Sequence, residues 1–208
     1  SIRSYNPPLE PEQNQVDRVI SALKESKRPV IYAGGGTIAS NASDELRELN
    51  SYIKAPVTNT LMGLGVYPGT DKYFLGMLGM HGTYQANMAM HNADLILAIG
   101  ARFDDRITNT PSKFAPKAKI VHFDVDHSSV SKIIEADIAV FGQVKNSLQA
   151  INEKLKLESE EFDEGRFTDW HNQIADWRKS HGLNHELYLE VDDSKPVLPQ
   201  AAVQHIYQ

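Results

Sequence analysis

Residues 100–106, with the sequence GARFDDR, place two arginines and two aspartates directly after a hydrophobic segment. Arginine binds phosphate oxygens through paired hydrogen bonds, and an aspartate carboxylate accepts hydrogen bonds from sugar hydroxyls. The four charged side chains could therefore bind a nucleotide. They could instead pair with one another in a solvated loop, where such ion pairs contribute little to stability. The motif by itself leaves both interpretations open.

A glycine-rich segment, GGGTIA at 34–39, is a second candidate for phosphate binding. It follows a short apolar run and fits the relaxed G-x-G-x-x-G/A pattern, in which glycines let the backbone approach a phosphate at a helix N-terminus. The acidic residue that would hold an NAD ribose after the next strand is missing, because Thr58, Asn59 and Thr60 occupy that place. A simple NAD-dependent dehydrogenase is therefore disfavoured. Glycines that only permit a tight turn remain the alternative.

The elements around these motifs alternate between strands and helices. Because the strands are apolar on both faces, they indicate a parallel sheet that is covered on both sides. We therefore predict an α/β protein with a doubly wound, Rossmann-like parallel sheet, helices on both faces, and a C-terminal helical linker segment. Strands are expected at 30–33, 55–60, 94–100, 119–126 and 137–142. Helices are expected at 11–26, 43–53, 80–93, 127–135 and 144–156.

The carboxyl ends of parallel strands lie along one edge of a sheet, where ligands bind. Nearly every such end in this chain is rich in glycine or polar residues, with apolar Leu61 and Met80 among them. Backbone amides, arginines, carboxylates and apolar walls together suit a dinucleotide or a nucleotide with a long tail. His81 and His122 lack a second ligand at metal-binding spacing, so we expect no metal site. The ends are 34–36, 60–62, 79–82, 100–106, 124–126 and 142–144.

The chain divides into an extended arm at 1–10, a nucleotide-binding α/β domain at 11–156 and a helical linker at 157–208. In the linker, one helical face is apolar and needs a partner surface, either this domain or a missing neighbour. If that face is exposed, self-association is expected. A further helix opens at Pro199. The residues of the apolar face are Phe167, Trp170, Ile174 and Trp177.

The composition narrows the class of protein. The 208 residues are 41% hydrophobic and 23% charged, which suits one α/β domain with its own core. A net charge of −6 argues against nucleic acid or an anionic membrane as partner. The lack of cysteine excludes disulfides and thiolate metal sites and fits a cytoplasmic protein. Because the chain starts at Ser1 and stops at Gln208 inside an expected helix, we expect a piece of a longer protein.

The segment 60–108, followed by IVHFDVD at 120–126, resembles the central domain of the biosynthetic acetolactate (acetohydroxyacid) synthase catalytic subunit, a thiamine-diphosphate enzyme family. The GMHGT and GARFDDR signatures carry this resemblance, which covers about residues 10–156. The stretch after 157, with its tryptophans and KPVLPQ, resembles the lead into that family's C-terminal thiamine-binding domain.

The resemblance implies an enzyme that condenses two 2-ketoacids, with loss of carbon dioxide, in branched-chain amino-acid biosynthesis. It implies FAD on this domain, without a net redox role, and thiamine diphosphate and Mg2+ on flanking domains. Asp105 and Arg106 would border the substrate channel. The implied cofactor-binding residues are Gly34, Gly35, Gly36, Thr60, Leu61, Met80, His81, Gly100, Arg102, Asp104, Arg106, Ile107, Asp124 and Val125.

The implied partners are the flanking domains of the same parent chain and further copies in a homodimer or homotetramer, with a regulatory subunit as another candidate. No Gly-Asp-Gly segment for magnesium and diphosphate occurs in the chain. We therefore expect no catalytic residue in this fragment and no activity from it alone.

Two positions depart from the family pattern. Gln143 stands where the family usually has Asp, and Asn109 where it commonly has Gly. The Gln143 change could weaken a hydrogen bond to the adenine or ribose end by about 1 kcal/mol. Two alternatives stay open: a structural spacer of a related thiamine-diphosphate enzyme, with an empty or ADP-type nucleotide site, and a stand-alone NAD- or ADP-binding enzyme.

Overall fold

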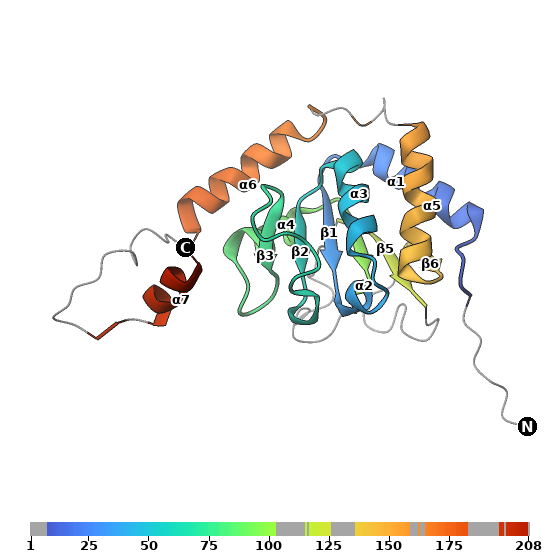
Figure 1. The fold of residues 1–208 in the computed structure, drawn as a ribbon. Helices are drawn as coiled ribbons and strands as arrows, with labels where there is room; N and C mark the ends of the chain where they lie inside the picture. The colour runs from blue at the N-terminus through green and yellow to red at the C-terminus, as the bar shows by residue number, and fades with distance from the viewer. Residues whose placement is uncertain are drawn as a thin grey trace, which may run out of the picture.

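The computed structural model describes residues 8–102, 115, 117–125, 136–158, 162, 165–182, 196–197 and 199–207. These residues form a six-stranded, all-parallel sheet in the order β3-β2-β1-β4-β5-β6 (Figure 1). The order reverses between β1 and β4, which is the switch point of a doubly wound sheet. The predicted α/β class and sheet type are confirmed. The strands are β1 (Pro29–Ala33), β2 (Val57–Asn59), β3 (Phe74–Met77), β4 (Leu95–Ile99), β5 (Lys119–Asp124) and β6 (Ile138–Phe141).

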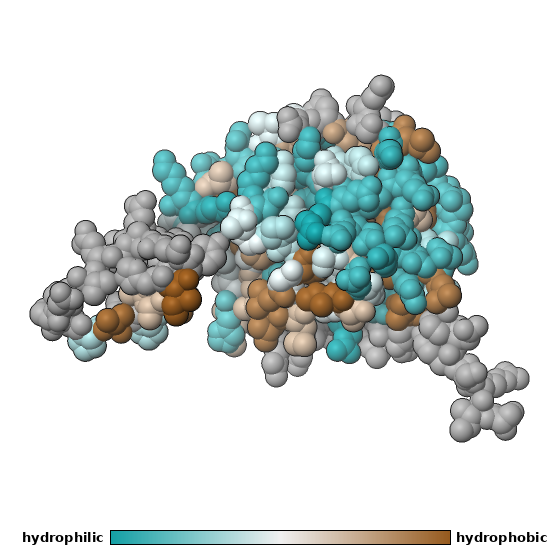
Figure 2. All heavy atoms as spheres, viewed as in Figure 1, coloured by the Kyte–Doolittle hydropathy of each residue, from teal (hydrophilic) through white to brown (hydrophobic). Residues whose placement is uncertain are grey.

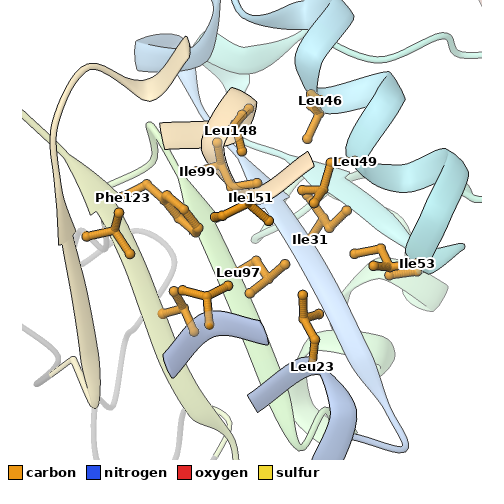
Figure 3. Close-up of a cluster of buried hydrophobic side chains, with 14 of the residues drawn as sticks. Leu23, Ile31, Leu46, Leu49, Ile53, Leu97, Ile99, Phe123, Leu148 and Ile151 are labelled. Atoms are coloured by element: carbon orange, nitrogen blue, oxygen red, sulfur yellow. The ribbon is translucent and has the colours of Figure 1, made fainter. Parts of the chain in front are cut away.

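Helices cover both faces of the sheet, so that alternate residues of each strand enter different cores. In β1, for example, Ile31 packs toward α1, α3 and α5, whereas Val30 and Tyr32 pack toward α4 and α6. Figure 3 shows the first core, where Leu97 and Phe123 lie against leucines and isoleucines of the helices. The helical segments are α1 (Gln13–Glu25), α2 (Gly35–Ala39), α3 (Ser43–Ile53), the 3-10 turn η1 (Leu61–Gly63), α4 (Tyr84–Asn92), α5 (Val144–Leu157), α6 (Thr168–His181) and α7 (Pro199–Tyr207).

Helix boundaries follow local side-chain chemistry. Glu12 and Gln15 form a reciprocal capping box at the start of α1. The helix expected from residue 80 begins four residues later, because the Thr83 hydroxyl accepts a hydrogen bond from the Ala86 amide at 3.2 Å and caps α4. The GMHGT residues before it therefore form a turn that connects β3 to α4.

The edge strand β3 is not among the strands expected from the sequence, although 79–82 is expected to be a strand end. Gly76 has φ of +88° and divides the apolar run FLGML, so periodicity gives no strand signal there. The pairing with β2 is also irregular, with a register shift between Val57 and Asn59. The position of 79–82 at a strand end is confirmed.

The tryptophan-bearing face of the C-terminal segment packs on this domain. Trp170 is 2% exposed, and its indole Nε1 donates a hydrogen bond to the Pro29 carbonyl at 3.1 Å. Trp177 lies edge-on to it, with ring centroids 5.8 Å apart. The expected self-association depended on this face being exposed, and that condition is not met. The helix expected at Pro199 is present as α7, whereas the helix expected at 127–135 lies outside the described residues.

Candidate functional site

The two central strand ends are packed backbone to backbone at the switch point. A Cβ on Gly34 would overlap the Gly100 carbonyl, and a Cβ on Gly36 would lie 2.9 Å from the Gly100 Cα. Gly100 itself has φ of +56°, where glycine avoids the strain of a side chain. The β1–α2 turn therefore needs glycine at 34 and 36 in order to lie against the end of β4.

Hydrogen bonds hold the same two segments together. The Gly34 amide donates to the Ile99 carbonyl and the Gly36 amide to the Gly100 carbonyl, both at 2.9 Å. The Thr37 hydroxyl adds a bond of 2.7 Å to the Ile99 carbonyl. The interpretation that these glycines permit a tight turn thus has direct structural support. Of the three glycines, Gly35 is the first residue of α2, where the amide has no partner within its own helix.

Apolar side chains are exposed beside this glycine turn. Leu61 is 65% exposed and Met62 75% exposed on η1, and Met80 of the GMHGT turn is 82% exposed. Figure 2 shows hydrophobic residues gathered along the lower side of the molecule, in the region of α2 and the segment between β2 and β3. Grouped exposed apolar residues mark an interaction site, because water is a poor environment for them.

Two hydrogen-bonding residues fix the turns that present these apolar side chains. The Thr60 amide donates to the Ala33 carbonyl at 3.0 Å, and its hydroxyl accepts from Gly63 at 3.0 Å. Asn87 accepts from the Gly79 amide at 3.2 Å and donates to the Gly79 carbonyl at 3.0 Å. Asn87 is not among the site residues expected from the sequence. The feature of the sequence that could have identified it is its amide side chain, which lies in the helix directly after a glycine-rich turn.

The charged and polar candidates on β4 and β5 lie at the same edge. Arg102 is exposed and directly follows Ala101, whose carbonyl accepts a hydrogen bond from the buried His122 Nε2 at 2.8 Å. Burial lowers the pKa of His122, and that hydrogen bond partly opposes the shift. His122 thus positions the start of the GARFDDR segment. Within the described part of the chain, no group of three His, Cys, Asp or Glu residues is placed to hold a metal ion.

The structure brings most of the predicted cofactor residues to the carboxyl edge of the sheet. Asp124 ends β5 there and Val125 follows it, and both residues are half-buried. Gln143 is the N-cap of α5 and makes no capping hydrogen bond through its side chain. The predicted residues that lie outside the described part of the chain are Asp104, Asp105, Arg106, Ile107 and Asn109. Those at the edge are Gly34, Gly35, Gly36, Thr60, Leu61, Met80, His81, Gly100, Arg102, Asp124 and Val125.

A family model described as thiamine pyrophosphate enzyme, central domain, matches residues 16–151, which include all six strands. The chain belongs to this family. The acetolactate synthase large subunit of Buchnera aphidicola (subsp. Acyrthosiphon pisum) is 44% identical over 208 residues, which are 100% of this chain and 35% of that protein. The acetolactate synthase isozyme 3 large subunit of Escherichia coli is 41% identical over 208 residues, which are again 100% of this chain and 35% of that protein. The chloroplastic acetolactate synthase of Arabidopsis thaliana is 40% identical over 197 residues, 95% of this chain and 28% of the relative.

This central-domain chain spans about a third of the length of the curated relatives that it matches. Across its described residues, no helix is both long and apolar enough to cross a bilayer.

Proposed function

We propose that this chain is the FAD-binding central domain of an acetolactate synthase large subunit, with the α/β domain at 11–156 as the binding unit. The observation that carries the proposal is the composition of the carboxyl edge at the switch point. Exposed Leu61 and Met80 lie along the same edge as the exposed cation Arg102 and the partly buried Asp124. Identity of 41–44% to two acetolactate synthase large subunits supports the same assignment.

Each group at the edge suits a different part of FAD. Arg102 would bind the pyrophosphate, and the Gly35 amide would add a donor next to it. Asp124 would accept hydrogen bonds from ribose hydroxyls, whereas Leu61 and Met80 would cover ring faces that water solvates poorly. When bound, FAD would supply no net redox chemistry and would order the border with the adjoining domains.

In the parent enzyme, condensation of two 2-ketoacids for branched-chain amino-acid synthesis would take place on thiamine diphosphate and Mg2+ held by other domains. This domain would contribute the border of the substrate channel, through Asp105 and Arg106, and no catalytic residue. The parent would assemble as a homodimer or homotetramer, and a regulatory subunit would be a further partner. An assay of the isolated chain should accordingly give no thiamine-dependent acetolactate. Measurable turnover would contradict this.

A spacer domain is the second candidate function. It is favoured by the internal bonds of the Gly34 and Gly36 amides, which explain these glycines without any ligand. In that case the nucleotide site would be empty or would accept only ADP.

Titration of the purified chain with FAD, followed by flavin fluorescence, separates the two functions. We expect saturable binding that Arg102→Ala weakens by about tenfold, as for the loss of one charge-assisted hydrogen bond. Arg47→Ala is the matched control, because Arg47 lies on α3 and pairs with Asp44. No saturation, or equal stabilisation of the fold by ADP and FAD, would favour the spacer.

A further inference from the structure

A cavity of about 390 Å3 lies between the edge strand β3 and helix α6. It is at the other end of the sheet from the candidate cofactor site, since Pro56 precedes β2 and Tyr73 precedes β3. Cavities of this size accommodate small organic ligands. The lining residues are Pro56, Lys72, Tyr73, Leu75, His171, Ile174, Ala175 and Arg178.

The charged side chains of this cavity are positive. Lys72 and Arg178 line it, and the described lining includes no Asp or Glu. Arg178 donates one hydrogen bond to the Phe74 carbonyl at 2.8 Å, which uses one of the five N–H donors of a guanidinium and anchors the group to β3. Lys72 lies over the Tyr73 ring, with its Nζ 4.9 Å from the ring centroid.

A second cavity, of about 440 Å3 between α1 and β6, is lined by both acidic and basic side chains and serves as a comparison. Its lining includes three acids and two bases. Lys119 pairs there with Glu25 at 2.7 Å, and Arg18 donates to the Asp137 carbonyl at 2.7 Å. The described lining of the cavity beside α6 has a different composition, with the bases Lys72 and Arg178 and no acid, which favours an anion.

The inner wall of the cavity beside α6 is apolar and aromatic. Pro56, Leu75 and Ile174 are buried, and the rings of Tyr73 and His171 lie 5.2 Å apart. His171 Nε2 donates to the Lys54 carbonyl at 2.8 Å, and burial lowers the His171 pKa. The imidazole is therefore neutral at neutral pH, and its Nδ1 is an acceptor. An ion without an apolar part would leave this wall in contact with water.

We propose that this cavity binds a small organic carboxylate, with its charged group at Lys72 and Arg178 and its apolar part against the buried wall. A carboxylate matches the planar fork of Arg178, which can bind both of its oxygens. The apolar wall selects a carboxylate with a compact aliphatic or aromatic group over an inorganic anion. The inference does not depend on FAD binding, because none of the lining residues lies at the carboxyl edge.

The proposal is tested by titrating benzoate into the 15N-labelled chain and recording amide shifts by NMR. We expect saturable shifts at His171 and Ala175. Benzyl alcohol, which has a similar apolar part and no charge, and inorganic phosphate, which has no apolar part, should both bind at least about tenfold more weakly. Equal binding of benzyl alcohol or of phosphate, or the lack of saturable shifts with benzoate, would overturn the proposal.

Substitutions in the cavity lining test whether benzoate binds in this cavity. Arg178→Gln should weaken benzoate binding by about tenfold, whereas Lys179→Gln, a change at the exposed neighbour on the same helix, should not alter it. Because Arg178 also anchors β3, Lys72→Gln serves as a second variant that leaves that hydrogen bond in place. Unchanged affinity in both Lys72→Gln and Arg178→Gln would show that the carboxylate is bound elsewhere.

Discussion

Gln143 lies at the N-terminal end of α5, where the type of side chain affects the stability of the helix. It occupies the N-cap of α5 with an extended backbone (φ −61°, ψ 133°), and its side chain does not cap the helix. Aspartate is among the preferred N-cap residues, because its carboxylate accepts a hydrogen bond from the first turn and interacts favourably with the helix dipole. Glutamine at this position therefore leaves α5 without a hydrogen bond from its N-cap side chain, apart from any effect on cofactor binding.

Replacement of Gln143 by Asp should raise the free energy of unfolding by about 1 kcal/mol, the usual contribution of an N-cap. Urea unfolding followed by circular dichroism measures this change. Gln143→Ser is the matched variant, since serine caps without a charge and separates the hydrogen bond from the dipole effect. If neither substitution increases stability, the N-cap of α5 is satisfied in another way.

A buried histidine, His122, and a half-buried one, His171, give the fold a pH dependence. Burial lowers the pKa of His122 and of His171 below the 6.5 of an ordinary imidazole, and hydrogen bonds to the Ala101 and Lys54 carbonyls partly oppose this. The positive charge of Lys72 lowers the His171 pKa further. Folding therefore favours the neutral form of both rings.

Stability should fall as the pH drops through about 6.5 toward the lower pKa values of the folded state, because in that window the unfolded chain binds more protons. Above 6.5 the contribution is fully present. Urea unfolding between about pH 7.5 and about pH 5 measures the trend, and NMR titration of the imidazoles assigns it to each residue. If a His122→Gln, His171→Gln double variant declines equally over this range, the carboxylates are responsible instead.

At the scale of elements, the GMHGT turn is held in place by the helix that follows it. Asn87 of α4 makes two hydrogen bonds to Gly79, at 3.2 and 3.0 Å, and a third to the Thr83 carbonyl at 3.0 Å. A Cβ on Gly82 would overlap the Met77 carbonyl, so the turn is also closely packed. The exposed Met80 therefore projects from a turn whose backbone is fixed at both ends.

Asn87→Ala should lower the free energy of unfolding by about 1–3 kcal/mol, since it leaves partly buried backbone groups of the turn without partners. On the proposed function it should also weaken FAD binding, because Met80 would no longer be held at the edge. Asn92→Ala is the control, as Asn92 lies on the same helix and bonds only to the Met88 carbonyl among the described contacts. Equal effects of the two substitutions would show that α4 stability, and not the turn, is what Asn87 supports.

At the scale of the whole molecule, α6 completes the second face of the sheet. Its Trp170 and Ile174 pack with Val30 of β1 in the core on the side of α4. At its far end, the ring of His181 stacks on that of Tyr84, the first residue of α4, with centroids 4.2 Å apart. Helix α6 is therefore part of the folded unit, and its C-terminal end lies against the start of α4.

Trp170→Ala should destabilise the fold by about 3–5 kcal/mol, the range for truncation of a large aromatic side chain in a core. Trp170→Phe keeps most of the buried surface and loses the hydrogen bond to Pro29, so about 1 kcal/mol is expected. Both changes are measurable by urea unfolding. Val203→Ala, at a side chain that is 68% exposed on α7, should have no measurable effect. A small effect of Trp170→Ala would mean that α6 is not required to cover the sheet.

The sequence by itself determined the fold class and the edge of the sheet that carries the candidate site. Strands that bury both faces, such as Leu95–Ile99, appear as uninterrupted apolar runs, and α3 has its apolar residues at helical spacing. Because the ends of parallel strands share one edge, the grouping of Gly34, Leu61 and Arg102 could be predicted without coordinates.

Only the tertiary structure decided which distant segments touch. The glycines at 34 and 36 are required by packing against Gly100, Asn87 fixes a turn that precedes its own helix, and α6 covers this domain and not another. Trp170 and its acceptor Pro29 are 141 residues apart in the chain. Local periodicity identifies a face that must be buried, whereas its partner depends on shape complementarity among all the elements, which no single segment contains.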